Sequence, residues 1–373
     1  VFGVNIWSIR LPQIILISIS WFILYKALLF AFNKKIALLT VLFLSIDASI
    51  IVYSKVDQGP TVLEFFLKIL AVSFLYLYLK TKKSIYFLSI FPILALGIFN
   101  KLNFIWFVNA FFISFLLFYG RNFYEDFKSR FDKLLPFLLI GISYFFLIKL
   151  FIKISRETAL SYKNFINAVD LSNISGNFLI FQKNLVDIIN GNIFFNVIYG
   201  YNPTLWGTFF SVLILLTLFI GGYLLVKQKA PRAYYFFVSI TILMIFQILM
   251  TKQAISAWHV LSIYPFFTVI FAAGIMQFKQ YALFCIALII FYQILINFTY
   301  LSKYSSPTKS IAYSSQIYHL IDFAKATKAK FICLDVDICN QLLSFTQQTG
   351  KFQDPFYYLD PHTYIESFIK LAG

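Results

Sequence analysis

The segment from Leu11 to Phe32 reads LPQIILISISWFILYKALLFAF and contains one charged residue, Lys26. A helix that crosses a bilayer needs about 20 mostly apolar residues, because each residue advances it by about 1.5 Å. The segment meets this requirement and predicts a membrane-spanning helix. Similar apolar runs recur along most of the chain. The pattern predicts an all-α polytopic membrane protein with about ten transmembrane helices.

The expected spans follow one rule of length and hydropathy. They cover residues 11–32, 36–53, 61–79, 85–99, 104–119, 134–152, 206–226, 233–250, 260–278 and 281–301. The fourth and fifth spans are short, and Asn100-Lys101-Leu102-Asn103 separates them. We expect a helix break there, where protein or water covers the exposed backbone.

The composition excludes a soluble globular enzyme. Of the 373 residues, 60% are hydrophobic and 12% are charged, against about 25% charged residues in an average soluble domain. The formal net charge of +16 would suggest a nucleic-acid partner in a soluble protein. Here the basic residues lie mainly between apolar runs, so they indicate topology and we expect no nucleic-acid partner.

Lysine and arginine concentrate in alternate connections between the expected helices. One set of connections contains Lys34, Lys35, Lys80, Lys82, Lys83, Arg121, Lys128, Arg130, Lys133, Lys227, Lys229, Arg232 and Lys279. The opposite short connections contain only Lys55, Lys101 and Lys252. Because basic connections stay in the cytoplasm, the second set is predicted to be extracytoplasmic.

Two longer stretches also fall on the predicted outer side. Residues 153–205 carry apolar side chains at helical spacing, such as Phe178, Phe181 and Ile188, which predicts short helices on the membrane surface. After residue 301 the composition becomes more polar. We predict a transmembrane domain at 1–301 and a small extracytoplasmic α/β unit at 302–373, with helices near 311–326 and 339–349 and a strand at 331–336.

Polar groups at the outer ends of the helices are the candidate site, because charge beside hydrocarbon is costly and usually serves a task. We predict that phosphate or sugar contacts come from Arg10, Lys55, Lys101, Lys252 and His259. Lys101 lies between two asparagines, so a cation and amides could bind an anionic head group. The alternatives are interfacial lysines that extend to water and an aromatic belt around Trp258.

Three further charged residues lie inside expected spans. Glu64 and Lys68 are spaced i, i+4 in the order that favours an ion pair, so mutual neutralisation is expected. Asp47 is predicted to face the bundle interior, protonated or hydrogen-bonded, with a transport or catalytic role as the alternative.

Several stretches resemble the dolichyl-phosphate-mannose protein mannosyltransferase family, glycosyltransferase family 39, and its bacterial relatives. They are FGVNIWSIRLP at Phe2–Pro12, Tyr53-Ser54-Lys55, Gly97-Ile98-Phe99-Asn100-Lys101, and His259 followed by Tyr264-Pro265. Their order and their outward placement agree with the topology predicted above, and the resemblance covers most of residues 1–278.

The resemblance implies a C-type glycosyltransferase in a bacterial inner (plasma) membrane. Such an enzyme moves a sugar from a polyprenyl phosphate to a protein, lipid or glycan acceptor on the extracytoplasmic face, with inversion. An acidic residue of the first outer loop acts as general base on the acceptor hydroxyl. We expect that residue upstream of Val1, with Asp57 as the nearest outer candidate.

The resemblance implies membrane lipid and the lipid-linked sugar as partners. No cofactor and no metal site are predicted, and dependence on a divalent metal stays open. The alternative function is a transporter or lipid-linked sugar flippase, and a third reading is a noncatalytic scaffold. A transporter should show internal repeats and polar groups near the membrane midplane, whereas the candidate site residues are predicted here at one face of the membrane. The sequence does not predict the sugar, the acceptor or the oligomeric state.

Overall fold

The computed structural model describes residues 6–54, 61–129, 149, 171–193, 195, 207–251, 256–304, 316–327, 331–332 and 352–353. The chain divides into two compact units. The larger unit comprises Gln13–Val197 and Tyr201–Thr308, and the smaller one Val1–Pro12, Ile198–Gly200 and Lys309–Gly373.

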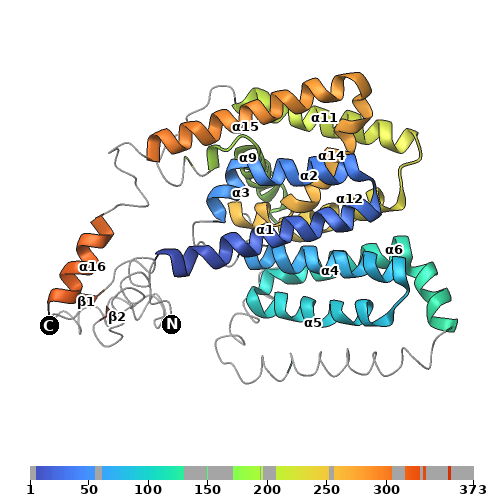
Figure 1. The fold of residues 1–373 in the computed structure, drawn as a ribbon, viewed down its shortest axis with the longest axis horizontal. Helices are drawn as coiled ribbons and strands as arrows, with labels where there is room; N and C mark the ends of the chain where they lie inside the picture. Colours follow the sequence, from blue (N-terminus) through green and yellow to red (C-terminus); the bar gives the residue numbers. More distant parts are fainter. Residues whose placement is uncertain are drawn as a thin grey trace. The chain divides into compact units, whose positions relative to one another are not determined.

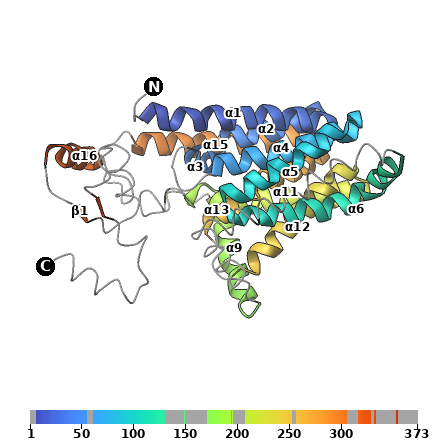
Figure 2. The same cartoon turned by 90° about the horizontal axis from the view of Figure 1, so that it is seen from below.

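Long apolar helices make up most of the larger unit and run along one common direction (Figures 1 and 2). Its described elements are α1 (Ile6–Ala31, which begins in the smaller unit), α2 (Lys34–Ile46), α3 (Ala48–Tyr53), α4 (Thr61–Thr81), α5 (Ser84–Asn100), η1 (Leu102–Phe104), α6 (Ile105–Ser129), α9 (Ile174–Ile189), α11 (Gly207–Lys227), α12 (Arg232–Leu249), α13 (Ala257–Leu261), α14 (Tyr264–Ile275), η2 (Met276–Tyr281) and α15 (Ala282–Tyr304). Side-by-side pairs include α4 with α5, α6 with α12, and α11 with α14.

Six described segments are long and apolar enough to cross a membrane: Leu11–Ala31, Thr61–Thr81, Leu102–Asp126, Phe209–Lys227, Arg232–Leu249 and Tyr264–Lys303. They confirm the predicted all-α polytopic architecture. The number of ten helices is not confirmed. The expected span 134–152 lies outside the described residues apart from residue 149, and the expected spans 36–53 and 260–278 are interrupted.

The first interruption is at Asp47, between α2 and α3. Asp47 has an extended backbone (φ −64°, ψ 120°), and its carboxylate Oδ1 accepts a 3.0 Å hydrogen bond from the Ile50 N–H at the start of α3. Its other oxygen accepts from the Tyr264 hydroxyl at 2.7 Å and from the Gln293 amide at 3.5 Å. Asp47 therefore faces the bundle interior, as predicted, and acts there as a helix cap.

Helix α14 is the centre of the bundle, because every one of its residues is buried. A helix that is apolar on all sides is expected in such a position. Helix α11 crosses it closely at Gly221, where an added Cβ would lie 2.5 Å from the carbonyl oxygen of Gly274. Small residues allow this kind of close packing between membrane helices.

The basic connections lie at one end of the bundle, called the lysine-rich end below (right in Figure 1). They join α1 to α2, α4 to α5, α11 to α12, and α14 to α15. In three of them a lysine adopts the left-handed region: Lys82 (φ 57°), Lys229 (φ 60°) and Lys279 (φ 48°). The opposite end holds α3 and α13 (Figure 2).

One helix, α9, lies within the range 153–205 that is predicted to form an outer loop. It packs against α13 and α11, and buries Phe181, Ile188 and Ile189. Phe178 is on its exposed side. The apolar spacing seen in the sequence therefore partly reflects packing against the bundle.

The described part of the smaller unit contains α16 (Gln316–Ala326), β1 (Phe331–Ile332) and β2 (Phe352–Gln353). The two strands pair in parallel, with Phe331 opposite Phe352. The helix expected at 339–349 lies outside the described residues. The α/β unit at 302–373 stays a prediction.

Candidate functional site

The expected helix break at Asn100-Lys101-Leu102-Asn103 is present at the end opposite the lysines. Helix α5 ends at Asn100, Lys101 is extended (φ −156°, ψ 124°), and η1 leads into α6. Gly97 permits the tight return, because a Cβ there would lie 2.2 Å from the ring of Phe104. The break places two amide side chains and one ammonium group within four consecutive residues.

Helix α4 contributes a buried ion pair beside this break. Lys68 donates to Glu64, and both side chains are buried, which confirms the predicted neutralisation. Lys68 also donates a 3.0 Å hydrogen bond to the backbone carbonyl of Ser262. Its Nζ lies 5.8 Å and 6.0 Å from the ring centres of Phe104 and Phe107, so the ammonium is held between polar partners and aromatic faces.

The short helix α13 brings His259 to the same place. Its ring centre lies 5.4 Å from that of Trp106 on α6, with the planes at 74°. The Ser262 hydroxyl donates a 2.6 Å hydrogen bond to the His259 carbonyl and fixes the turn into α14. Residues separated by more than a hundred positions thus meet at one point.

The charges around His259 set its protonation. Burial, then the positive charges of Lys101 and Lys68, lower the pKa of His259 from 6.5 to about 4. Burial also lowers the pKa of Lys101, while the nearby charge of Glu64 raises it. At neutral pH the imidazole is therefore uncharged and can donate or accept a hydrogen bond.

This group of residues holds several buried polar atoms that have no hydrogen-bond partner among the described residues. They are Asn100 Nδ2, Asn103 Nδ2, Asn103 Oδ1 and His259 Nδ1. Asn103 is only 8% exposed. An unpaired buried polar group costs about 1–3 kcal/mol, so such a cluster calls for an explanation, and a polar ligand supplies one. We name Lys68, Asn100, Lys101, Asn103 and His259 the amide–lysine cluster.

Of the sequence-predicted contacts, the structure brings Lys101 and His259 together. Arg10 lies in α1, in the part that belongs to the smaller unit, and its side chain is not described. Lys55, Lys252 and the candidate base Asp57 lie outside the described residues.

Sequence reasoning missed the link from Lys68 to Ser262 and the packing of Trp106 on His259. The sequence signal for this region was the i, i+4 pair of Glu64 and Lys68, which indicates an ion pair in a span but does not indicate which residues pack beside it. Among the described residues, no three His, Cys, Asp or Glu side chains are grouped to hold a metal ion.

The cluster contains two amides and two lysines in the amino-terminal part of the chain, at an end of a membrane bundle. Residues 1–149 match the model of the dolichyl-phosphate-mannose-protein mannosyltransferase family. The match confirms the resemblance seen in the sequence for that part of the chain. The family's description names a mannosyltransferase, and the match covers 149 of the 373 residues.

The matched segment contains Lys68, Asn100, Lys101 and Asn103, whereas His259 lies beyond it. The mannosyltransferase-like segment therefore supplies most of the amide–lysine cluster, and α13 completes it. Neither the search of curated proteins nor the search of solved structures found a match to the chain.

Proposed function

We propose that the protein transfers a sugar from a polyprenyl phosphate to an acceptor hydroxyl at the end of the bundle that holds the amide–lysine cluster. The observation that carries this proposal is the set of unpartnered atoms on Asn100, Asn103 and His259 beside Lys68 and Lys101. A phosphate group offers acceptor oxygens and negative charge, which suit amide donors and ammonium groups.

The chemistry assigns distinct tasks to these side chains. The acceptor oxygen bonds to C1 of the sugar while the bond from C1 to the phosphate oxygen breaks, and the acceptor proton passes to a general base. Negative charge then grows on the departing polyprenyl phosphate, and fixed cations stabilise it. Lys101 serves as the main counter-charge, because Lys68 is already neutralised by Glu64. The neutral His259 and the amide of Asn103 orient the phosphate or the sugar.

The general base is not assigned to a described residue. Glu64 is unsuited to the task, since it is buried in its pair with Lys68. Asp57, Arg10, Lys55 and Lys252 remain proposed contributors from the same predicted side. That side is proposed to be extracytoplasmic, because the opposite end carries the lysine-rich connections.

The test uses the full chain in proteoliposomes with radiolabelled polyprenyl-phosphate sugar and a membrane extract as the acceptor source. Lys101→Ala should lower label transfer at least about tenfold, since charge-assisted hydrogen bonds contribute about 1.5–3 kcal/mol. Lys183→Ala on α9 is the control, because that lysine is exposed and outside the cluster. Equal transfer by both variants would remove the assignment.

The same preparation separates the alternative function. Label that enters sealed vesicles without becoming bonded to an acceptor would favour a transporter or flippase. If label is found neither on an acceptor nor inside the vesicles, the noncatalytic scaffold becomes the better interpretation. Adding a chelator to the transfer assay tests dependence on a divalent metal, which the sequence leaves open.

A further inference from the structure

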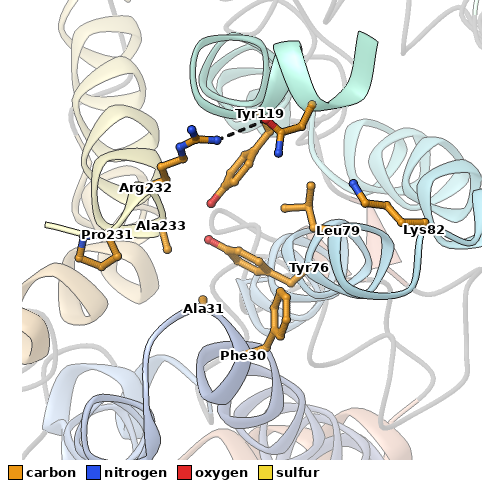
Figure 3. Close-up of a pocket in the computed structure, with 10 residues that line it drawn as sticks. Phe30, Ala31, Tyr76, Leu79, Lys82, Tyr119, Pro231, Arg232 and Ala233 are labelled. Carbon is orange, nitrogen blue, oxygen red and sulfur yellow. Dashed lines mark hydrogen bonds between the residues drawn. The ribbon is translucent and has the colours of Figure 1, made fainter. Parts of the chain in front are cut away.

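A cavity with an apolar lining and a few polar side chains lies at the lysine-rich end, at the far end of α4 from the amide–lysine cluster. It has a volume of about 260 Å³, and its walls come from the ends of α1, α4 and α6 and the start of α12 (Figure 3). Pockets for whole small molecules occupy about 300–1,000 Å³. The cavity is therefore sized for a small polar group.

One wall contains a buried tyrosine hydroxyl. Tyr76 is 3% exposed, and its hydroxyl faces that of Tyr119 without another partner at hydrogen-bond distance among the described residues. Figure 3 shows the hydroxyls of Tyr76 and Tyr119 both turned toward the middle of the cavity. Burying a hydroxyl without a partner costs free energy, so this hydroxyl is suited to donate to a bound group.

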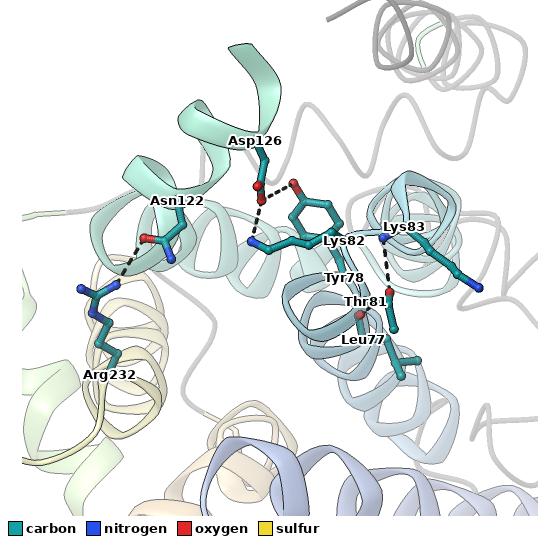
Figure 4. A network of polar contacts seen from close by, with 8 residues as sticks. All are labelled: Leu77, Tyr78, Thr81, Lys82, Lys83, Asn122, Asp126 and Arg232. Carbon is teal, nitrogen blue, oxygen red and sulfur yellow. Dashed lines mark hydrogen bonds and ion pairs between the residues drawn. The ribbon is translucent and has the colours of Figure 1, made fainter. Parts of the chain in front are cut away.

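The opposite wall is electropositive. Helix α12 begins there at Arg232, with Pro231 as its N-cap, no side-chain capping bond and no acidic residue in its first turn. A helix start of this kind carries partial positive charge and binds anions. Arg232 adds a full charge and donates a 3.3 Å hydrogen bond to the side-chain oxygen of Asn122 (Figure 4).

Lys82 also lines the cavity, but its charge is partly offset. Its Nζ lies 2.6 Å from Asp126, which also accepts a 3.4 Å hydrogen bond from Tyr78 (Figure 4). Lys82, Arg232 and Asp126 together carry a net charge of +1. The cavity thus combines two tyrosine hydroxyls, an uncapped helix start and one uncompensated positive charge.

We propose that this cavity binds a phosphate group at the lysine-rich end, separate from the transfer site. The source that the structure favours is the head group of an anionic phospholipid. Phe30 lines the cavity and is 44% exposed as a residue, at the end of the apolar segment Leu11–Ala31. The cavity therefore opens beside apolar surface along which an acyl chain can lie.

The test measures binding to the purified full chain in a neutral detergent by native mass spectrometry. The probes are dioleoyl phosphatidylglycerol, dioleoyl phosphatidylcholine and sn-glycerol 3-phosphate. Arg232→Gln and Tyr76→Phe should each weaken binding of the first phosphatidylglycerol, the former about tenfold or more. Arg121→Gln is the control, because Arg121 is 90% exposed at the same end and outside the cavity.

The Tyr76→Phe variant distinguishes a loss of lipid binding from a loss of folding. The variant removes one buried oxygen that faces the Tyr119 hydroxyl and makes no strong hydrogen bond, so the lipid-free protein should keep its thermal stability while losing affinity for the anionic lipid. Tighter binding of phosphatidylglycerol than of sn-glycerol 3-phosphate supports a lipid source, and equal binding supports a soluble phosphate source. Affinities that are the same in all variants, or equal for phosphatidylcholine and phosphatidylglycerol, would overturn the proposal.

Discussion

The ammonium group of Lys68 donates a 3.0 Å hydrogen bond to the backbone carbonyl oxygen of Ser262. The bond joins α4, which lies in the mannosyltransferase-like segment, to the junction of α13 and α14 beyond it. Since Lys68 also pairs with Glu64, one buried side chain connects the two parts of the amide–lysine cluster. Because Lys68 is fully buried and bonded to the Ser262 carbonyl, it is a structural support for the turn that carries His259.

Lys68→Met should destabilise the protein by about 3–5 kcal/mol, because it leaves the Glu64 carboxylate buried without a partner. The double variant Glu64→Leu/Lys68→Met should recover part of this loss, since it removes both charges together. Reversible unfolding in mixed micelles, followed by tryptophan fluorescence, measures the free energy of unfolding of the single and the double variant. A double variant that loses the sum of the two single effects would show that the residues do not act as a pair.

Asn103→Leu should separate stability from activity. The change removes two unpartnered buried atoms, so the free energy of unfolding should rise by about 1 kcal/mol. Sugar transfer should fall, because the proposed phosphate or sugar contact is lost. The paired measurement is a thermal midpoint together with the radiolabel assay.

Asn109→Leu on α6, the helix that follows η1, serves as the control for this variant. Its amide donates a 2.9 Å hydrogen bond to Gln247, so its removal should bring no gain in stability. If Asn103→Leu instead lowers the midpoint and leaves transfer unchanged, Asn103 has a structural partner and no ligand.

Local features of the fold were predictable from the sequence. The break at Lys101 follows from three polar residues within the four positions 100–103, which separate two apolar runs, and the pairing of Glu64 with Lys68 follows from helical spacing. The interruption at Asp47 was not predictable, because the run 36–53 is long enough to span. What ends α2 is a capping carboxylate that is itself held by Tyr264 and Gln293, which are far away in the sequence.

The same limit applies to the two candidate sites: single residues could be selected from the sequence, but their arrangement in space could not. Lys101 and His259 could be selected individually as costly polar groups at one face. Their proximity depends on how α5, α6 and α13 pack, which no local pattern encodes. The cavity at the lysine-rich end was missed, since Tyr76 reads as one apolar position of a span and Arg232 as one of many topology signals.

Gly221→Leu should destabilise the bundle strongly, by about 3 kcal/mol or more, because a side chain there meets the backbone of Gly274. The close crossing of α11 and α14 would have to open. Gly120→Ala is the control, since its Cβ would find its nearest neighbour at 3.8 Å. Equal thermal midpoints for the two variants would contradict the close crossing.

His259 should make the protein sensitive to mild acid. Its pKa is about 4 in the folded protein and 6.5 when unfolded, so below pH 6.5 the unfolded chain binds a proton that the folded chain does not. Stability therefore falls between pH 6.5 and 4, by about 2 kcal/mol at pH 5, and is unaffected above that window. His259→Gln should remove this part of the pH dependence. The measurement is the change in the free energy of unfolding between pH 7.5 and pH 5, which should be about 2 kcal/mol larger in the parent than in the variant. Equal changes in the two proteins would show that His259 is not held neutral by burial and by the charges of Lys101 and Lys68.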